Sequence, residues 1–107
     1  MAKFLVTYHR QAAPADAASA ELTRTAIDAW VAGAGSAVID PGAPLRAVTQ
    51  LSGDDREPDE ATGAFQAIDG YCVIEVGSIE AASDQLRSHP LLASGGTLQI
   101  NEVLGGW

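Results

Sequence analysis

The sequence predicts a single α+β domain over residues 1–107, built from an antiparallel sheet with two helices on one face. Two observations lead to this fold class. Short segments that alternate between apolar and polar residues indicate strands, and two longer stretches have the spacing of amphipathic helices. Along the chain these segments follow the order β-α-β, β, β-α-β, which is close to the two β-α-β halves of a ferredoxin-like fold.

The first strand is predicted over residues 3–9, where β-branched and aromatic residues alternate. One face of this strand carries Phe4, Val6 and Tyr8, and the other carries Leu5, Thr7 and His9. A helix is predicted over residues 17–32, with Asp16 or Ser19 as its N-cap and with Gly33 and Gly35 at its end. Its predicted apolar stripe comprises Ala18, Leu22, Ala26, Ala29 and Trp30.

The centre of the chain combines short apolar segments with turn residues. A strand over residues 36–39 is predicted to end at the turn sequence Asp40-Pro41-Gly42, and the next strand covers residues 46–51. Residues 53–60 contain five carboxylates among eight positions. Because like charges repel and prefer water, this acidic stretch is predicted to be a solvated loop.

The second half of the chain repeats the β-α-β pattern. A strand is predicted over residues 70–76, with Glu75 on the face opposite to Cys72 and Ile74. Ser78 is the predicted N-cap of the second helix, which ends near His89 because Pro90 follows. The apolar stripe of this helix comprises Ile79, Ala82 and Leu86, and the last strand is predicted over residues 97–103.

The sheet face opposite to the helices is predicted to be polar and patterned. Strand alternation gives this face Thr7, His9, Tyr71, Val73, Glu75, Gln99 and Asn101. Such a set predicts the wall of a cleft or the inner face of a two-subunit barrel. His9, Glu75, Gln99 and Asn101 are therefore the candidate substrate-binding residues.

Composition and charge narrow the function classes. The net charge of −8, from 14 acidic and 6 basic residues, argues against a nucleic-acid partner. No apolar run approaches the roughly 20 residues of a membrane span, so we expect no membrane association. Cys72 is the single cysteine, and the chain starts without a secretory pattern, which predicts a cytoplasmic protein. About 20 of the apolar residues are alanine, and this thin core predicts a homodimer.

Several segments together resemble the YciI-like (YCII-related) family. They cover residues 3–6, 39–45, 70–76, 78–82, 88–92 and 95–100. The resemblance implies a dimeric α/β barrel, in which two ferredoxin-like sheets face each other, and a cleft in each subunit. It also implies a relation to small enzymes, such as a chlorohydroxyhydroquinone dehydrochlorinase, in which a His and Asp pair carries out acid–base chemistry. The chain has His89-Pro90 where members carry Asp-Pro, and it lacks both their first-helix histidine and the DGPF tetrapeptide of a related group.

His89 and Asp40 are the candidate catalytic residues. An imidazole that titrates near neutral pH is a natural general acid or base, and a carboxylate within hydrogen-bond reach raises its pKa. Their structural alternatives are a helix-terminal histidine and a turn aspartate. The pair predicts a cofactor-independent lyase or isomerase acting on a small organic molecule, and the alternative is a non-catalytic small-molecule-binding or regulatory accessory module. No metal is predicted, because His9, His89, Asp40 and Glu75 show no ligand spacing.

Overall fold

The computed structural model describes residues 1–10, 16–49, 51, 53 and 67–107. Four strands form one antiparallel sheet in the order β2-β3-β1-β4. They are β1 (Ala2–His9), β2 (Val38–Pro44), β3 (Gly70–Val76) and β4 (Thr97–Glu102). The two central strands, β1 and β3, pair with Phe4 opposite Ile74 and Val6 opposite Cys72. The predicted ferredoxin-like α+β fold is thereby confirmed.

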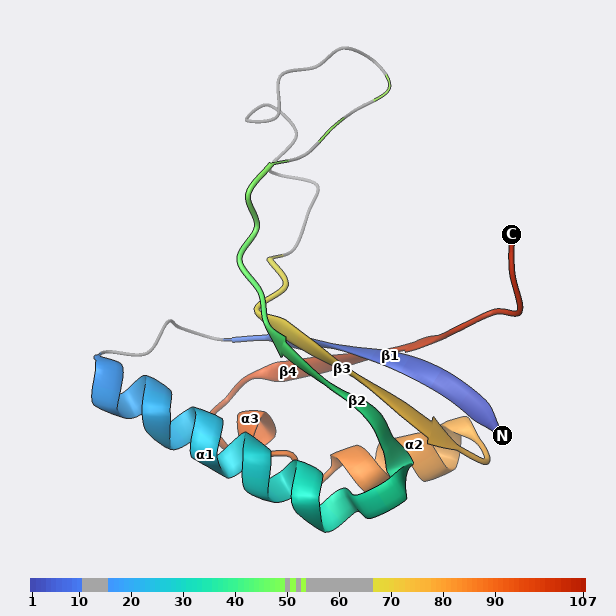
Figure 1. The fold of residues 1–107 in the computed structure, drawn as a ribbon, viewed down its shortest axis with the longest axis horizontal. Coiled ribbons are helices and arrows are strands. Elements are labelled where there is room, and N and C mark those ends of the chain that lie inside the picture. The colour runs from blue at the N-terminus through green and yellow to red at the C-terminus, as the bar shows by residue number, and fades with distance from the viewer. Residues whose placement is uncertain (11–15, 50, 52, 54–66) are drawn as a thin grey trace.

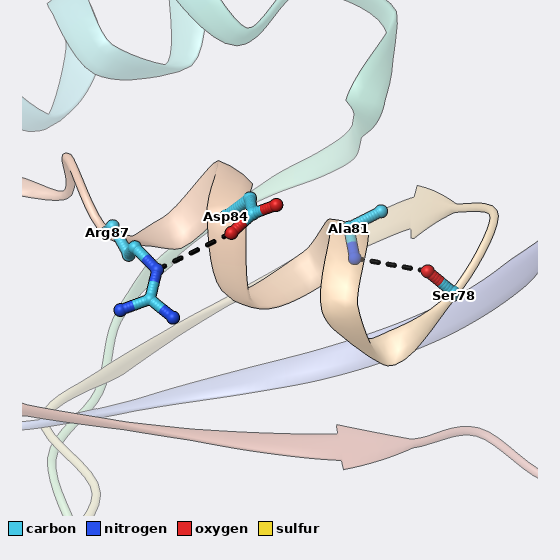
Figure 2. Close-up of polar contacts among 4 residues, drawn as sticks. All are labelled: Ser78, Ala81, Asp84 and Arg87. Carbon is cyan, nitrogen blue, oxygen red and sulfur yellow. Dashed lines mark hydrogen bonds and ion pairs between the residues drawn. The ribbon is translucent and has the colours of Figure 1, made fainter.

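The helices α1 (Ala17–Ala34), α2 (Ile79–Leu86) and α3 (Pro90–Ala93) lie on the same side of the sheet (Figure 1). The predicted N-caps are confirmed at two of them. The Asp16 carboxylate accepts a hydrogen bond from the Ser19 amide at 2.8 Å, and the Ser78 hydroxyl accepts one from the Ala81 amide at 3.1 Å (Figure 2). The second helix was predicted to continue to about His89, but it ends at Leu86 and the short α3 follows.

The core lies between the sheet and the helices. Its fully buried apolar side chains are Phe4, Val6, Tyr8, Cys72, Ile74, Ala82, Leu86 and Leu91. The first five come from alternate positions of β1 and β3, which confirms the predicted strand faces. Ile79 was predicted to join this stripe, but its side chain is 48% exposed because it stands in the first turn of α2.

The predicted apolar stripe of α1 is right at Ala26 and Trp30, which are half-buried, and wrong at Ala18, Leu22 and Ala29, which are exposed. Leu22 is 72% exposed, whereas Ile27 and Trp30 pack against the core. The half-buried residues of α1 are Ser19, Thr23, Ala26, Ile27, Trp30, Val31 and Ala34. The large side chains Ile27, Trp30 and Val31 fix the rotation of the helix, because burying them removes more apolar surface from water than burying alanines. No residue of α1 is fully buried.

The central strands differ from the prediction. The turn sequence Asp40-Pro41-Gly42 does not end a strand but lies inside β2, where the register with β3 shifts on both sides of Asp40. Gly42 has a φ of 71°, and its amide donates to the Asp40 carboxylate at 2.8 Å. The turn therefore forms as a local irregularity within the strand and does not end it. Residues 46–49 and 51 form no strand, and the acidic stretch 54–60 lies outside the described residues.

Candidate functional site

A pocket of about 280 Å³ lies between α1 and the sheet, and we name it the α1–β2 pocket. One wall is a single face of α1, formed by Ala20, Thr23, Arg24, Ile27, Asp28 and Val31. The other wall comes from the sheet and α3, and it comprises Tyr8, Arg10, Pro41, Gly42, Ala43, Pro44, Asp69, Tyr71 and Leu91. The volume lies just below the usual range of ligand pockets, so it suits a small molecule.

The pocket explains why the side chains of α1 are only half-buried at most. The α1 wall residues recur every three or four positions, as one face of a helix does. Ile27 and Val31 on that face remain only half-buried although they point toward the sheet. Gly42, on the opposite wall, has no side chain to fill the space between them. A face of α1 that carries both apolar and polar side chains therefore borders the pocket instead of a packed surface.

A buried aromatic cluster adjoins the pocket. The ring of Tyr8, which lines the pocket, lies 4.8 Å from the ring of His89, and the Trp30 ring lies 4.7 Å from His89 on another side. The Trp30 indole N–H donates to the Ser88 hydroxyl at 3.0 Å, which ties the C-terminal half of α1 to the segment before α3. Burial raises the pKa of Tyr8 well above its usual range, and the neighbouring Cys72 thiol adds to the rise. The Tyr8 hydroxyl therefore stays protonated.

His89 is buried between α2 and α3. Its Nδ1 accepts a hydrogen bond from the Leu91 amide at 3.1 Å and so caps α3. A neutral imidazole that accepts at Nδ1 carries its proton on Nε2. Burial lowers the pKa of His89 to about 4, so the ring is neutral at pH 7. Within the described chain Nε2 has no hydrogen-bond partner.

Asp40 and His89 are not brought together by any hydrogen bond or ion pair among the described residues. The Asp40 carboxylate accepts from the Gly42 amide instead, as a turn aspartate does. The expectation that Asp40 raises the pKa of His89 is wrong, because burial of the ring acts alone and in the opposite direction. Neither residue lines the α1–β2 pocket, although both neighbour residues that do.

The predicted substrate-binding residues lie on the sheet face opposite to the helices. His9 is buried there: its Nδ1 donates to the Ala67 carbonyl at 2.8 Å, and its Nε2 accepts from the Thr7 hydroxyl at 2.8 Å. The Gln99 amide donates to Asn101 at 2.8 Å, and Asn101 donates to the Leu5 carbonyl at 3.0 Å.

Glu75, the fourth residue of this set, lies opposite Lys3 in the register of β1 and β3. None of the four lines the α1–β2 pocket. The structure therefore separates these four residues from the α1–β2 pocket. Tyr71 is the residue of the predicted polar face that does line the pocket.

Strand alternation predicts a closed core on the helix-facing side of the sheet, so it does not predict the α1–β2 pocket. Tyr8 was assigned to the core by strand alternation, and that assignment is correct, yet its side chain also forms part of the pocket wall. The available signal was the second periodic set of α1, Thr23, Ile27 and Val31, which is offset from the alanine-rich stripe.

No family model matches the chain, and no curated protein matches it. Among the described residues, no helix is both long and apolar enough to cross a membrane. The same residues contain no group of three or more histidine, cysteine, aspartate or glutamate side chains placed to hold a metal ion.

Proposed function

We propose that the chain binds a small organic molecule in the α1–β2 pocket. The observation that carries the proposal is the space of about 280 Å³ between the sheet and the face of α1 that presents both apolar side chains, Ile27 and Val31, and polar ones. Leaving Ile27 and Val31 half-exposed forgoes the free energy of their burial, and an apolar occupant would recover it. Tyr8 and Leu91 extend the same apolar lining to the sheet and α3.

Of the two predicted function classes, the geometry favours the binding or regulatory accessory module over the lyase or isomerase. A general base must offer a free acceptor near neutral pH. The acceptor nitrogen of His89 is occupied by the Leu91 amide. Neither His89 nor Asp40 lines the α1–β2 pocket. The ferredoxin-like order of elements supports a place in the YciI-like family. The single cysteine supports a cytoplasmic location.

Filling the mouth of the pocket is expected to abolish binding. We choose Ala20→Trp, because Ala20 is an exposed residue of the α1 wall, and indole as a neutral probe. In a two-dimensional amide NMR titration of the wild type, indole should shift the signals of both pocket walls, and Ala20→Trp should remove those shifts.

The matched control is Ala29→Trp, which places the same side chain on an exposed position of α1 outside the pocket. It should leave the indole-induced shifts unchanged. Shifts that survive Ala20→Trp, or a wild-type titration in which neither wall responds, would remove the proposed site.

We also propose that the protein is a homodimer formed through the sheet face opposite to the helices. Leu5 and Val73 lie opposite each other there and are only half-buried in one chain. Sedimentation equilibrium at micromolar concentration should give about twice the chain mass of 11.0 kDa. Val73→Lys should return the chain to a monomer, because it places a charge inside the interface. Ile79→Lys, on the 48% exposed Ile79 side chain of α2, is the control that should remain dimeric, and a monomeric wild type would refute the proposal.

A further inference from the structure

The charged residues of the α1–β2 pocket differ in balance from those of the whole chain. The chain carries 14 acidic and 6 basic residues, yet two arginines and two aspartates line the pocket. These are Arg10, Arg24, Asp28 and Asp69. The pocket therefore has no net charge in a protein whose surface is strongly negative.

Each wall of the pocket carries one charge of each sign. Arg24 and Asp28 lie four residues apart on the same face of α1. On the sheet side, the Arg10 amide donates to the Asp69 carboxylate at 2.7 Å, and the Asp69 amide donates to the Tyr8 carbonyl at 2.7 Å. These two hydrogen bonds fix Asp69 beside Arg10 at the end of β1.

The charged groups of the α1 wall are available to a ligand. The ion pair of Arg24 is with Glu21, at 3.7 Å and with both side chains 67% exposed. Such an exposed pair contributes little, so a ligand carboxylate can replace Glu21 without a large cost. Asp28 makes no hydrogen bond or ion pair with any residue that the structure describes.

We infer that the ligand of the pocket is a small zwitterion with an apolar body, of the class of α-amino acids with apolar side chains. Its carboxylate faces Arg10 and Arg24, its ammonium faces Asp28 and Asp69, and its apolar part lies against Ile27, Val31 and Leu91. A singly charged molecule meets a like charge on each wall, whereas a zwitterion satisfies both signs. This inference rests on the proposed binding function and adds the ligand class to it.

Three probes with the same phenyl body test the inference. L-phenylalanine carries both charges, 3-phenylpropanoate lacks the ammonium, and 2-phenylethylamine lacks the carboxylate. In amide NMR titrations, L-phenylalanine should bind at least about tenfold more tightly than either analogue, since each lost charged hydrogen bond weakens binding by about that factor. Equal affinity for L-phenylalanine and one analogue would overturn the inference.

Two substitutions assign the charges to their ligand groups. Arg24→Gln should weaken the binding of L-phenylalanine and 3-phenylpropanoate about tenfold, and it should not weaken 2-phenylethylamine, because it removes a like charge from that amine's surroundings. Asp28→Asn should weaken L-phenylalanine and 2-phenylethylamine about tenfold and should not weaken 3-phenylpropanoate. The matched control is Arg87→Gln. Arg87, the C-cap of α2, pairs with Asp84 at 3.5 Å, also as an exposed pair three residues apart (Figure 2). This control should change no affinity. Unchanged binding of L-phenylalanine by Arg24→Gln would refute the assignment.

Binding of the neutral probe indole distinguishes a failure of the ligand class from a failure of the proposed binding site. Indole binding without any preference for L-phenylalanine would leave the pocket as a ligand site and overturn the ligand class. Failure of indole and of all three phenyl probes to shift either wall would overturn the proposed function itself.

Discussion

Gly42→Ala is expected to lower the free energy of unfolding by roughly 3 kcal/mol or more, one of the largest effects available to a single substitution in this chain. Gly42 has a φ of 71°, where a side chain is strained, and an added Cβ would overlap the carbonyl oxygen of Tyr71. The same Cβ would lie 2.6 Å from the Tyr71 carbonyl carbon. Since both obstacles are backbone atoms of β3, no side chain can rotate away, and β2 must separate from β3.

Urea denaturation of the variant and the wild type measures this loss. The matched control is Gly33→Ala, because Gly33 lies within α1 and an added Cβ would meet nothing within 4 Å. That substitution should stabilise the protein by about 0.5–1 kcal/mol, as alanine does in a helix interior. A Gly42→Ala protein that unfolds at the wild-type urea concentration would show that β2 does not approach β3 as the structure has it.

Acidification is expected to cost the protein about 3 kcal/mol of stability through His89 alone. In the folded chain burial lowers the pKa of His89 to about 4, whereas the unfolded chain has the ordinary value of 6.5. Between pH 6.5 and pH 4, His89 is therefore protonated in the unfolded state but remains neutral in the folded state. The stabilising contribution is complete above pH 6.5, declines as the pH falls toward 4, and is lost below that value.

Denaturation curves between pH 7 and pH 4 measure this effect, and His89→Asn provides the comparison. An asparagine oxygen can still accept from the Leu91 amide and cap α3, but it does not titrate in this range. The variant should be less stable at pH 7 and should lose less stability on acidification. His9 is present in both proteins, so its contribution cancels. An NMR titration that places the pKa of His89 near 6.5 would contradict the buried geometry.

The strand faces could be predicted because alternation along β1 and β3 is regular. Val6 and Cys72 lie opposite each other in the core, and Thr7 and Tyr71 lie opposite each other on the other face. The caps of α1 and α2 were predictable for a similar reason, because Asp16 and Ser78 act on amides three residues away. Patterns within a few neighbouring residues were therefore sufficient to predict the strand faces and the helix caps.

The path of β2 was not predictable from local patterns. Asp40-Pro41-Gly42 forms its turn-like hydrogen bond as expected, but pairing with β3 keeps the chain extended through it. That outcome depends on a contact with residues about 30 positions away, between Gly42 and Tyr71. The α1–β2 pocket was missed for the same reason, since its two walls meet only after the whole sheet has assembled.

The irregular course of β2 limits how the sheet can grow by strand addition. Pro41 and Pro44 have no N–H to offer, and two register shifts in the pairing with β3 make the course of this edge strand irregular. The opposite outer strand, β4, keeps an unbroken register with β1 from Phe4–Glu102 to His9–Thr97. Of the four strands described, only β4 therefore presents a regular edge. Among the described strands, addition at the β4 edge would therefore join two chains and leave no second regular edge for further growth.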